Sequence, residues 1–307
     1  MTVKACFKFL IFSLALLSSI SSYETAYAQQ KITPSHVYQV TEDVILQLER
    51  MHKANLSTPN LDSLELNIPN RLPRHVIQQA FNVRKTIQFF KKVNGMEFSE
   101  VTPPEVHEIT PAEVLSVTKE ILDSLVAFDE TFKLTPFQPS ASFVDGKTPT
   151  DVYKNLLRAQ EMIIQLGIPP IVPNNVYDSA IALNHDLSLI RKALGDATSM
   201  TVDTESLGKT PVDAYNLAHY TLQNLKTLTE KPAFTIPKGV IMPEKLKKAS
   251  PREVQQVLLY ALAEVSSIKA KLGIMEVQLI PEPSVGQTPS SVYDQLSLAN
   301  RQIQSML

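Results

Sequence analysis

The sequence predicts an all-α protein made of two tandem four-helix bundle-like units. A phrase close to Thr-Pro-x-x-Val-Tyr recurs eight times, and each copy opens a segment of about 20 residues with periodic apolar positions. The first four copies repeat as the second four at a spacing of about 139 residues, which indicates an internal duplication. The copies begin at Pro34, Pro73, Pro111, Pro149, Pro173, Pro211, Pro251 and Pro289.

Each copy of the phrase has the chemistry of a helix N-terminus. Threonine is a good N-cap residue, and proline at the first helical position loses no hydrogen bond that the helix needs. An acidic residue three positions after the cap completes or resembles a capping box, as in Thr110 with Glu113. Leu72 and Val172 occupy the cap position in two copies, so we expect those helices to start less sharply.

Beyond the cap, apolar residues recur with alternating spacings of four and three. The third copy shows the pattern at Val114, Ile121, Leu125 and Phe128. This period is typical of helices that pack in a bundle through coiled-coil-like seams. All eight segments carry it, so the sequence predicts eight helices.

The seams contain small residues near the helix starts and large ones near the helix ends, for example Ala80 and Phe90 in the second copy. An antiparallel bundle would place each small half against a large half of a neighbour, so close packing favours antiparallel helices. Most connectors have about 15 to 18 residues, which can span the roughly 30 Å of a 20-residue helix. Parallel helices joined by crossovers therefore remain an open alternative.

The first 28 residues have the pattern of a signal peptide. Lys4 and Lys8 precede a short apolar stretch, and Ala26-Tyr27-Ala28 matches a cleavage site. We therefore expect a signal peptide at 1–28, a first unit at 29–167 and a second unit at 168–307. Cleavage near Ala28 would deliver the mature chain to the periplasm or the exterior, and the sequence leaves both compartments open.

Composition limits the classes of function. The only cysteine, Cys6, lies in the predicted signal peptide, so the mature chain has no disulfide or thiolate site. The formal net charge of −2 argues against nucleic acid and against a polybasic membrane contact. No later segment is long and apolar enough to predict a membrane span. We expect no cofactor.

Five tyrosines share one position of the repeat and form the only candidate binding set. Their rings either pack structurally under an incoming connector or form an aromatic row that binds a ligand or partner. The five are Tyr38, Tyr153, Tyr177, Tyr215 and Tyr293.

Catalytic and metal motifs are missing from the sequence. The six histidines occupy different repeat positions without metal-ligand spacing, so they are expected to be solvated or partly buried single residues. The acidic residues are expected to be cap partners or to face solvent. No nucleophile motif or phosphate-binding glycine loop is found, so we expect no catalytic and no metal-binding residues.

These observations favour an exported, non-catalytic helical-repeat protein that binds or scaffolds another protein of the cell envelope or exterior. The long connectors, chiefly 55–71 and 231–249, are the expected recognition elements. The alternative is an extracytoplasmic four-helix sensor or carrier module that holds a small ligand inside a bundle.

Overall fold

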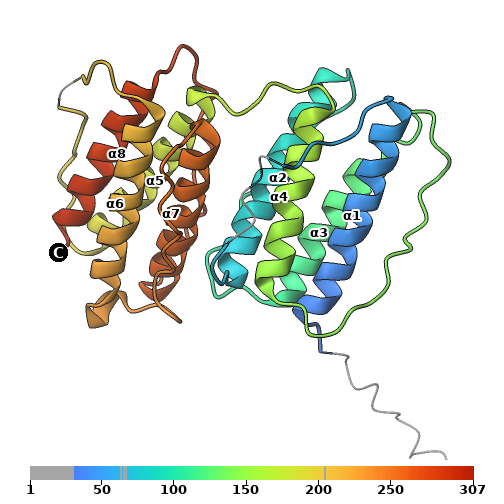
Figure 1. The fold of residues 1–307 in the computed structure, drawn as a ribbon. Coiled ribbons are helices and arrows are strands. Elements are labelled where there is room, and N and C mark those ends of the chain that lie inside the picture. Colours follow the sequence, from blue (N-terminus) through green and yellow to red (C-terminus); the bar gives the residue numbers. More distant parts are fainter. Residues whose placement is uncertain (1–30, 63, 65–67, 204) are drawn as a thin grey trace, which may run out of the picture. The chain divides into compact units, whose positions relative to one another are not determined.

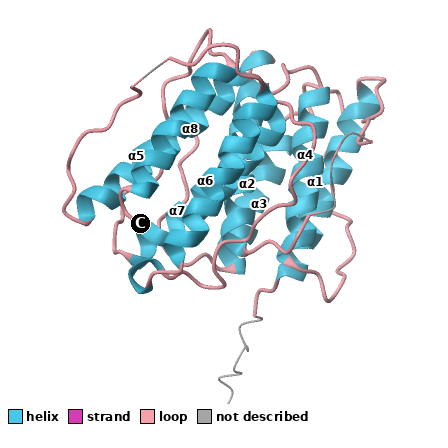
Figure 2. Ribbon diagram, turned by 60° about the vertical axis from the view of Figure 1, so that its left-hand side comes forward, coloured by secondary structure: helices cyan, strands magenta, loops and turns pink. Residues whose placement is uncertain are grey.

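The computed structural model describes residues 31–62, 64, 68–203 and 205–307. This part of the chain contains eight α-helices and no strand (Figures 1 and 2), which confirms the predicted all-α class. All eight helices belong to one compact unit, Thr33–Leu307. The predicted signal peptide at 1–28, including Cys6, lies outside the described residues.

Every helix begins at the proline of its repeat, as the capping chemistry predicts. A short 3-10 helix, η1, follows α6 at Pro232–Phe234. The α-helices are α1 Pro34–Ala54, α2 Pro73–Val93, α3 Pro111–Val126, α4 Pro149–Gln165, α5 Pro173–Ala193, α6 Pro211–Thr229, α7 Pro251–Lys271 and α8 Pro289–Gln304.

The third helical residue accepts a hydrogen bond from the cap residue even where it is not acidic. In α3 the backbone N–H of Thr110 donates to Oε2 of Glu113 at 2.8 Å. In α2 the N–H of Leu72 donates instead to Nδ1 of His75 at 3.0 Å. A histidine nitrogen thus replaces the carboxylate, and a helix without a polar cap side chain still starts at its proline.

The helices form two groups of four. In the first group α1 and α2 each pack against α3 and α4, so α1 lies diagonally across from α2. In the second group α5 and α6 each pack against α7 and α8 in the same way. Between the groups, α2 packs against α7.

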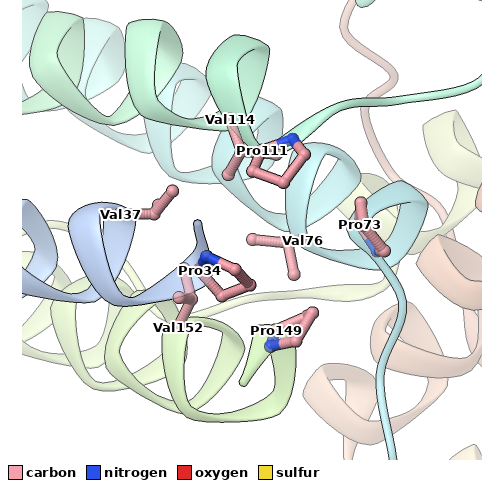
Figure 3. Close-up of a pocket in the computed structure, with 8 residues that line it drawn as sticks. All are labelled: Pro34, Val37, Pro73, Val76, Pro111, Val114, Pro149 and Val152. Carbon is pink, nitrogen blue, oxygen red and sulfur yellow. The ribbon is translucent and has the colours of Figure 1, made fainter. Parts of the chain in front are cut away.

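Within each group all four helices start at the same end, so the expectation of antiparallel packing is wrong. The opening prolines and first seam residues of α1–α4 surround one small cavity (Figure 3). The connectors return along the outside of the bundle to this end (Figure 1). The first cavity is lined by Pro34, Val37, Pro73, Val76, Pro111, Val114, Pro149 and Val152, and its counterpart by Pro173, Val176, Pro211, Ala214, Pro251, Val254, Pro289 and Val292.

One seam layer of the second group shows how parallel helices pack when small and large residues share a layer. Seven residues after their opening prolines, α5 and α6 carry Ala180 and Ala218, whereas α7 and α8 carry Leu258 and Leu296. All four side chains are buried. The two alanines lie on diagonal helices, so the leucines fill the layer between them.

Side chains at the helix starts anchor the returning connectors. The residue just before a cap donates its backbone N–H to the second residue of a neighbouring helix, twice in each bundle. The pairs are Lys147 with Ser35 at 3.1 Å, Arg71 with Thr150 at 2.8 Å, Lys209 with Ser290 at 3.0 Å, and Gln287 with Asn174 at 2.8 Å.

Candidate functional site

Three of the five candidate tyrosines pack under connectors or against a neighbouring helix. The ammonium of Lys147 lies 4.2 Å from the ring centre of Tyr38, and that of Lys209 lies 4.4 Å from the ring centre of Tyr293. The hydroxyl of Tyr177 accepts a hydrogen bond of 3.2 Å from the Gln295 amide. Tyr38 and Tyr293 thus contact the residue that leads into a neighbouring helix, whereas Tyr177 contacts a residue within α8.

The other two candidate tyrosines are buried, and both lie near Tyr260 of α7. The ring centre of Tyr153 is 5.9 Å from that of Tyr260. Tyr215 and Tyr260 line the same pocket, and the Tyr215 hydroxyl donates to the carbonyl of Glu244 at 3.2 Å. The structure therefore brings Tyr153 and Tyr215 toward the contact of α2 with α7 and leaves the other three elsewhere.

Arg71 is the central residue of this region. It precedes the cap of α2, the place that Lys147 and Lys209 hold before α4 and α6. Unlike those half-buried lysines, Arg71 is only 2% exposed. Its guanidinium carbon lies 3.9 Å from the ring centre of Tyr260 and 5.8 Å from that of Tyr153. Its Nε and Nη1 have no hydrogen-bond partner among the described residues.

A small pocket of about 50 Å³ lies beside Arg71. We call it the Arg71 pocket. Connectors 55–72 and 230–250 form part of its wall, and α6 and α7 form the rest. Its lining includes Ile68, Arg71, Tyr215, Leu246, Glu253 and Tyr260.

A buried ionic cluster joins α2 to α7 next to the pocket. Glu264 of α7 is fully buried, with Oε2 2.8 Å from Nη2 of Arg74 and Oε1 2.9 Å from Nε2 of His75. Because Nδ1 of His75 accepts the Leu72 N–H, Nε2 carries the proton and donates it to Glu264. Burial is the largest effect and lowers the pKa of His75, although the contact with Glu264 acts in the opposite direction, so the ring is neutral near pH 7.

Connector 230–250 is bonded to this cluster. Arg74 donates to the carbonyls of Pro237 at 2.9 Å and of Gly239 at 2.6 Å, and the N–H of Ile241 donates to Glu264 at 3.3 Å. Gly239 has φ +58° and Lys238 has φ +60°, so two left-handed residues form the turn that presents these carbonyls. The connector is thus held by buried charges.

A larger cleft of about 570 Å³ lies next to this turn. We call it the junction cleft. The start of α2, connectors 94–110 and 230–250, and the end of α7 line it. Apolar groups such as Val106, Ile109 and Met275 alternate with the cations Arg74, Lys238 and Lys271. Glu108 is the one carboxylate in its lining among the described residues.

The sequence interpretation missed the residues that make this site. His75 was expected to be solvated or partly buried and Glu264 to cap a helix or face solvent, yet both are buried. The physical reason is that a second bundle covers this face of α2. One signal was present: α7 is apolar on all sides over 257–263, which is typical of a helix buried all round.

None of the helices in the described part of the chain is long and apolar enough to cross a membrane. The described residues also contain no group of three or more His, Cys, Asp or Glu side chains that could hold a metal ion. Searches against known protein families, curated proteins and solved structures found no match for this chain.

Proposed function

We propose that the mature chain is an exported, non-catalytic binding protein that holds a protein partner at the junction of α2 and α7. The observation that carries this proposal is the junction cleft of about 570 Å³, because the start of α2, the end of α7 and two connectors converge on it. Connectors on a rigid scaffold are the usual carriers of recognition. Of the two connectors expected to recognise a partner, connector 230–250 is the better candidate, because it lines both the junction cleft and the Arg71 pocket.

The lining of the junction cleft favours a particular surface on the partner. Met275 is 66% exposed beside the cleft, and Lys238 and Lys271 are exposed at its edge. An apolar segment with acidic side chains would cover Met275 and pair with the two ammonium groups. Such a segment is the expected binding element of the partner.

The buried cluster supports a binding role over a catalytic one. Both ring nitrogens of His75 are occupied, one by the Leu72 N–H and the other by Glu264. Glu264 itself is held between Arg74 and His75. A general acid or base must come within hydrogen-bond reach of the reacting group, directly or through one water. These side chains instead join two bundles.

A capture experiment tests the proposal. The mature chain is used as bait against the envelope fraction of its source, beside a Lys238→Glu/Lys271→Glu variant. A matched control, Lys192→Glu/Lys226→Glu, changes two exposed lysines of α5 and α6 that do not line the cleft. We expect the wild type and the control to retain one partner that the cleft variant loses. A partner that all three chains retain would contradict the proposal.

A small ligand in the junction cleft is the second candidate. The cleft volume lies within the range of about 300–1,000 Å³ found for small-molecule sites, and most of its lining is apolar. A thermal-shift screen with amphipathic acids distinguishes the two candidates. A shift that the Lys238→Glu/Lys271→Glu variant abolishes would favour the ligand; silence across the screen would favour the protein partner.

A further inference from the structure

We infer that the Arg71 pocket binds a single carboxylate group. This inference rests on the proposed binding function and adds the chemistry that the junction recognises. It concerns the Arg71 pocket beside the junction cleft, so its tests use different residues.

The guanidinium of Arg71 has donors that the protein does not use. Nε and Nη1 have no hydrogen-bond partner among the residues that the structure describes, although Arg71 is only 2% exposed. Leaving buried charged donors without acceptors is costly, and native structures rarely do so. Stacking on Tyr260 at 3.9 Å stabilises the face of the guanidinium but not its N–H groups. An acceptor in the pocket would satisfy them.

The repeat does not require an arginine here. Lys147, Lys209 and Gln287 hold the equivalent place before α4, α6 and α8, and their backbone N–H groups make the same anchoring bond as that of Arg71. These three lie nearer to solvent. The buried guanidinium is therefore a feature of the junction and not of the bundle.

In the described part of the chain no carboxylate forms an ion pair with Arg71, although Glu244 and Glu253 line its pocket. Glu264 is already paired with Arg74 and His75. Glu253 lines the pocket, but Oε2 accepts the Ser250 N–H at 2.7 Å and Oε1 accepts from Arg252 at 3.0 Å. Three exposed lysines follow Glu244 on connector 230–250: Lys245, Lys247 and Lys248.

Pocket size and shape select the ligand class. One water needs about 10–15 Å³ of such space, so about 50 Å³ holds one carboxylate but no extended molecule. A planar guanidinium matches a planar carboxylate through two parallel hydrogen bonds. The neighbouring Glu244 and Glu253 disfavour a doubly charged anion such as phosphate. The carboxylate belongs either to a small free acid or to the C-terminus of a peptide segment.

Titration calorimetry on the mature chain tests the inference. The probes are sodium acetate, acetyl-Ala-Ala with a free carboxylate, the same dipeptide as its amide, and inorganic phosphate, all at constant ionic strength. We expect the two carboxylates to bind and the amide and phosphate to bind at least about tenfold more weakly. Tighter binding of the dipeptide acid points to a C-terminal source, and tighter binding of acetate points to a small acid.

Arg71→Gln should weaken carboxylate binding by about tenfold or more, whereas Lys147→Gln and Lys209→Gln, at equivalent places, should bind as the wild type does. If Arg71→Gln fails to fold by circular dichroism, Arg71→Lys takes its place, because it keeps the charge and loses the paired geometry. Carboxylate binding that is absent from the wild type, or unchanged in the Arg71 variant, overturns the inference. Neither result affects the capture experiment, which depends on Lys238 and Lys271.

Discussion

Lys269 of α7 donates a hydrogen bond of 2.7 Å to Oδ1 of Asp186 of α5, and both side chains are buried. In the first bundle a glutamine and an aspartate occupy the same two places, counted from the opening prolines. There Gln47 donates to Oδ1 of Asp129, also at 2.7 Å. The acid thus lies on α5 in one pair and in the turn after α3 in the other, while the hydrogen bond between the two places is kept.

Removing the cation of this buried pair should destabilise the protein. Lys269→Met leaves the Asp186 carboxylate buried without compensation, which costs about 3–5 kcal/mol of unfolding free energy at pH 7. Burial already raises the pKa of Asp186, so the carboxyl of the variant takes up a proton as pH falls and the loss shrinks. Urea unfolding at pH 7 and pH 5 measures both effects. Lys271→Met, at an exposed position of the same helix, is the control; equal losses in the two variants would contradict the prediction.

Transplanting the pair of the first bundle should restore stability. The double variant Asp186→Gln/Lys269→Asp recreates the Gln47–Asp129 arrangement at the corresponding places. We expect it to recover more than half of the stability that Lys269→Met loses, because the amide again donates to the carboxylate. A double variant less stable than Lys269→Met would show that the two places are not equivalent.

The seam assignment predicts the effect of one core truncation. Ile163 of α4 is fully buried, so Ile163→Ala should cost about 2–5 kcal/mol through lost transfer energy and a cavity. The neighbouring Ile164 is half-buried, and Ile164→Ala should cost less. Urea unfolding of both variants provides the comparison. A near-neutral Ile163→Ala would mean that the seam is wrongly assigned.

His75 should make the protein less stable in mild acid. Its pKa is lowered by burial, so below about 6.5 the unfolded chain takes up a proton that the folded chain does not. The unfolding free energy therefore falls as pH decreases from about 6.5 toward the lowered pKa. His75→Gln keeps an acceptor for the Leu72 N–H and should flatten this dependence. Unfolding at pH 7.5 and pH 5.5 measures it, and an equal loss in wild type and variant would refute the assignment.

Export predicts a defined mature N-terminus. Sequencing the N-terminus of the protein from the envelope or external fraction should give Gln29 as its first residue, because cleavage is expected after Ala28. A protein in that fraction that still begins at Met1 would contradict the predicted signal peptide.

Local chemistry made the helices predictable. Each start depends on a cap, a proline and an acceptor within four residues, so the sequence places it at the residue observed, as at Thr110 and Pro111. Helix direction was not predictable from the same data. It depends on which copies share a seam layer. That the small Ala180 and the large Leu258 fill one layer can be recognised only when the packing is known.

The contact of α2 with α7 was harder to predict from the sequence than the helices were. Arg71 resembles Lys147 and Lys209 in the repeat, and only the contact of α2 with α7 makes it buried. Tyr260 occupies no place in the tyrosine row, so the row indicated Tyr153 and Tyr215 but not the tyrosine of α7 that lies near both.

The most direct test of the Arg71 pocket as a binding site is a methyl NMR titration of the mature chain with sodium acetate. Ile68 and Val257 line this pocket, whereas Val176 and Val292 line the cavity at the start of the second bundle. We expect the Ile68 and Val257 signals to shift saturably and the other two to stay in place. Saturable shifts absent from Ile68 and Val257, or equal shifts at all four methyl sites, would contradict the assignment.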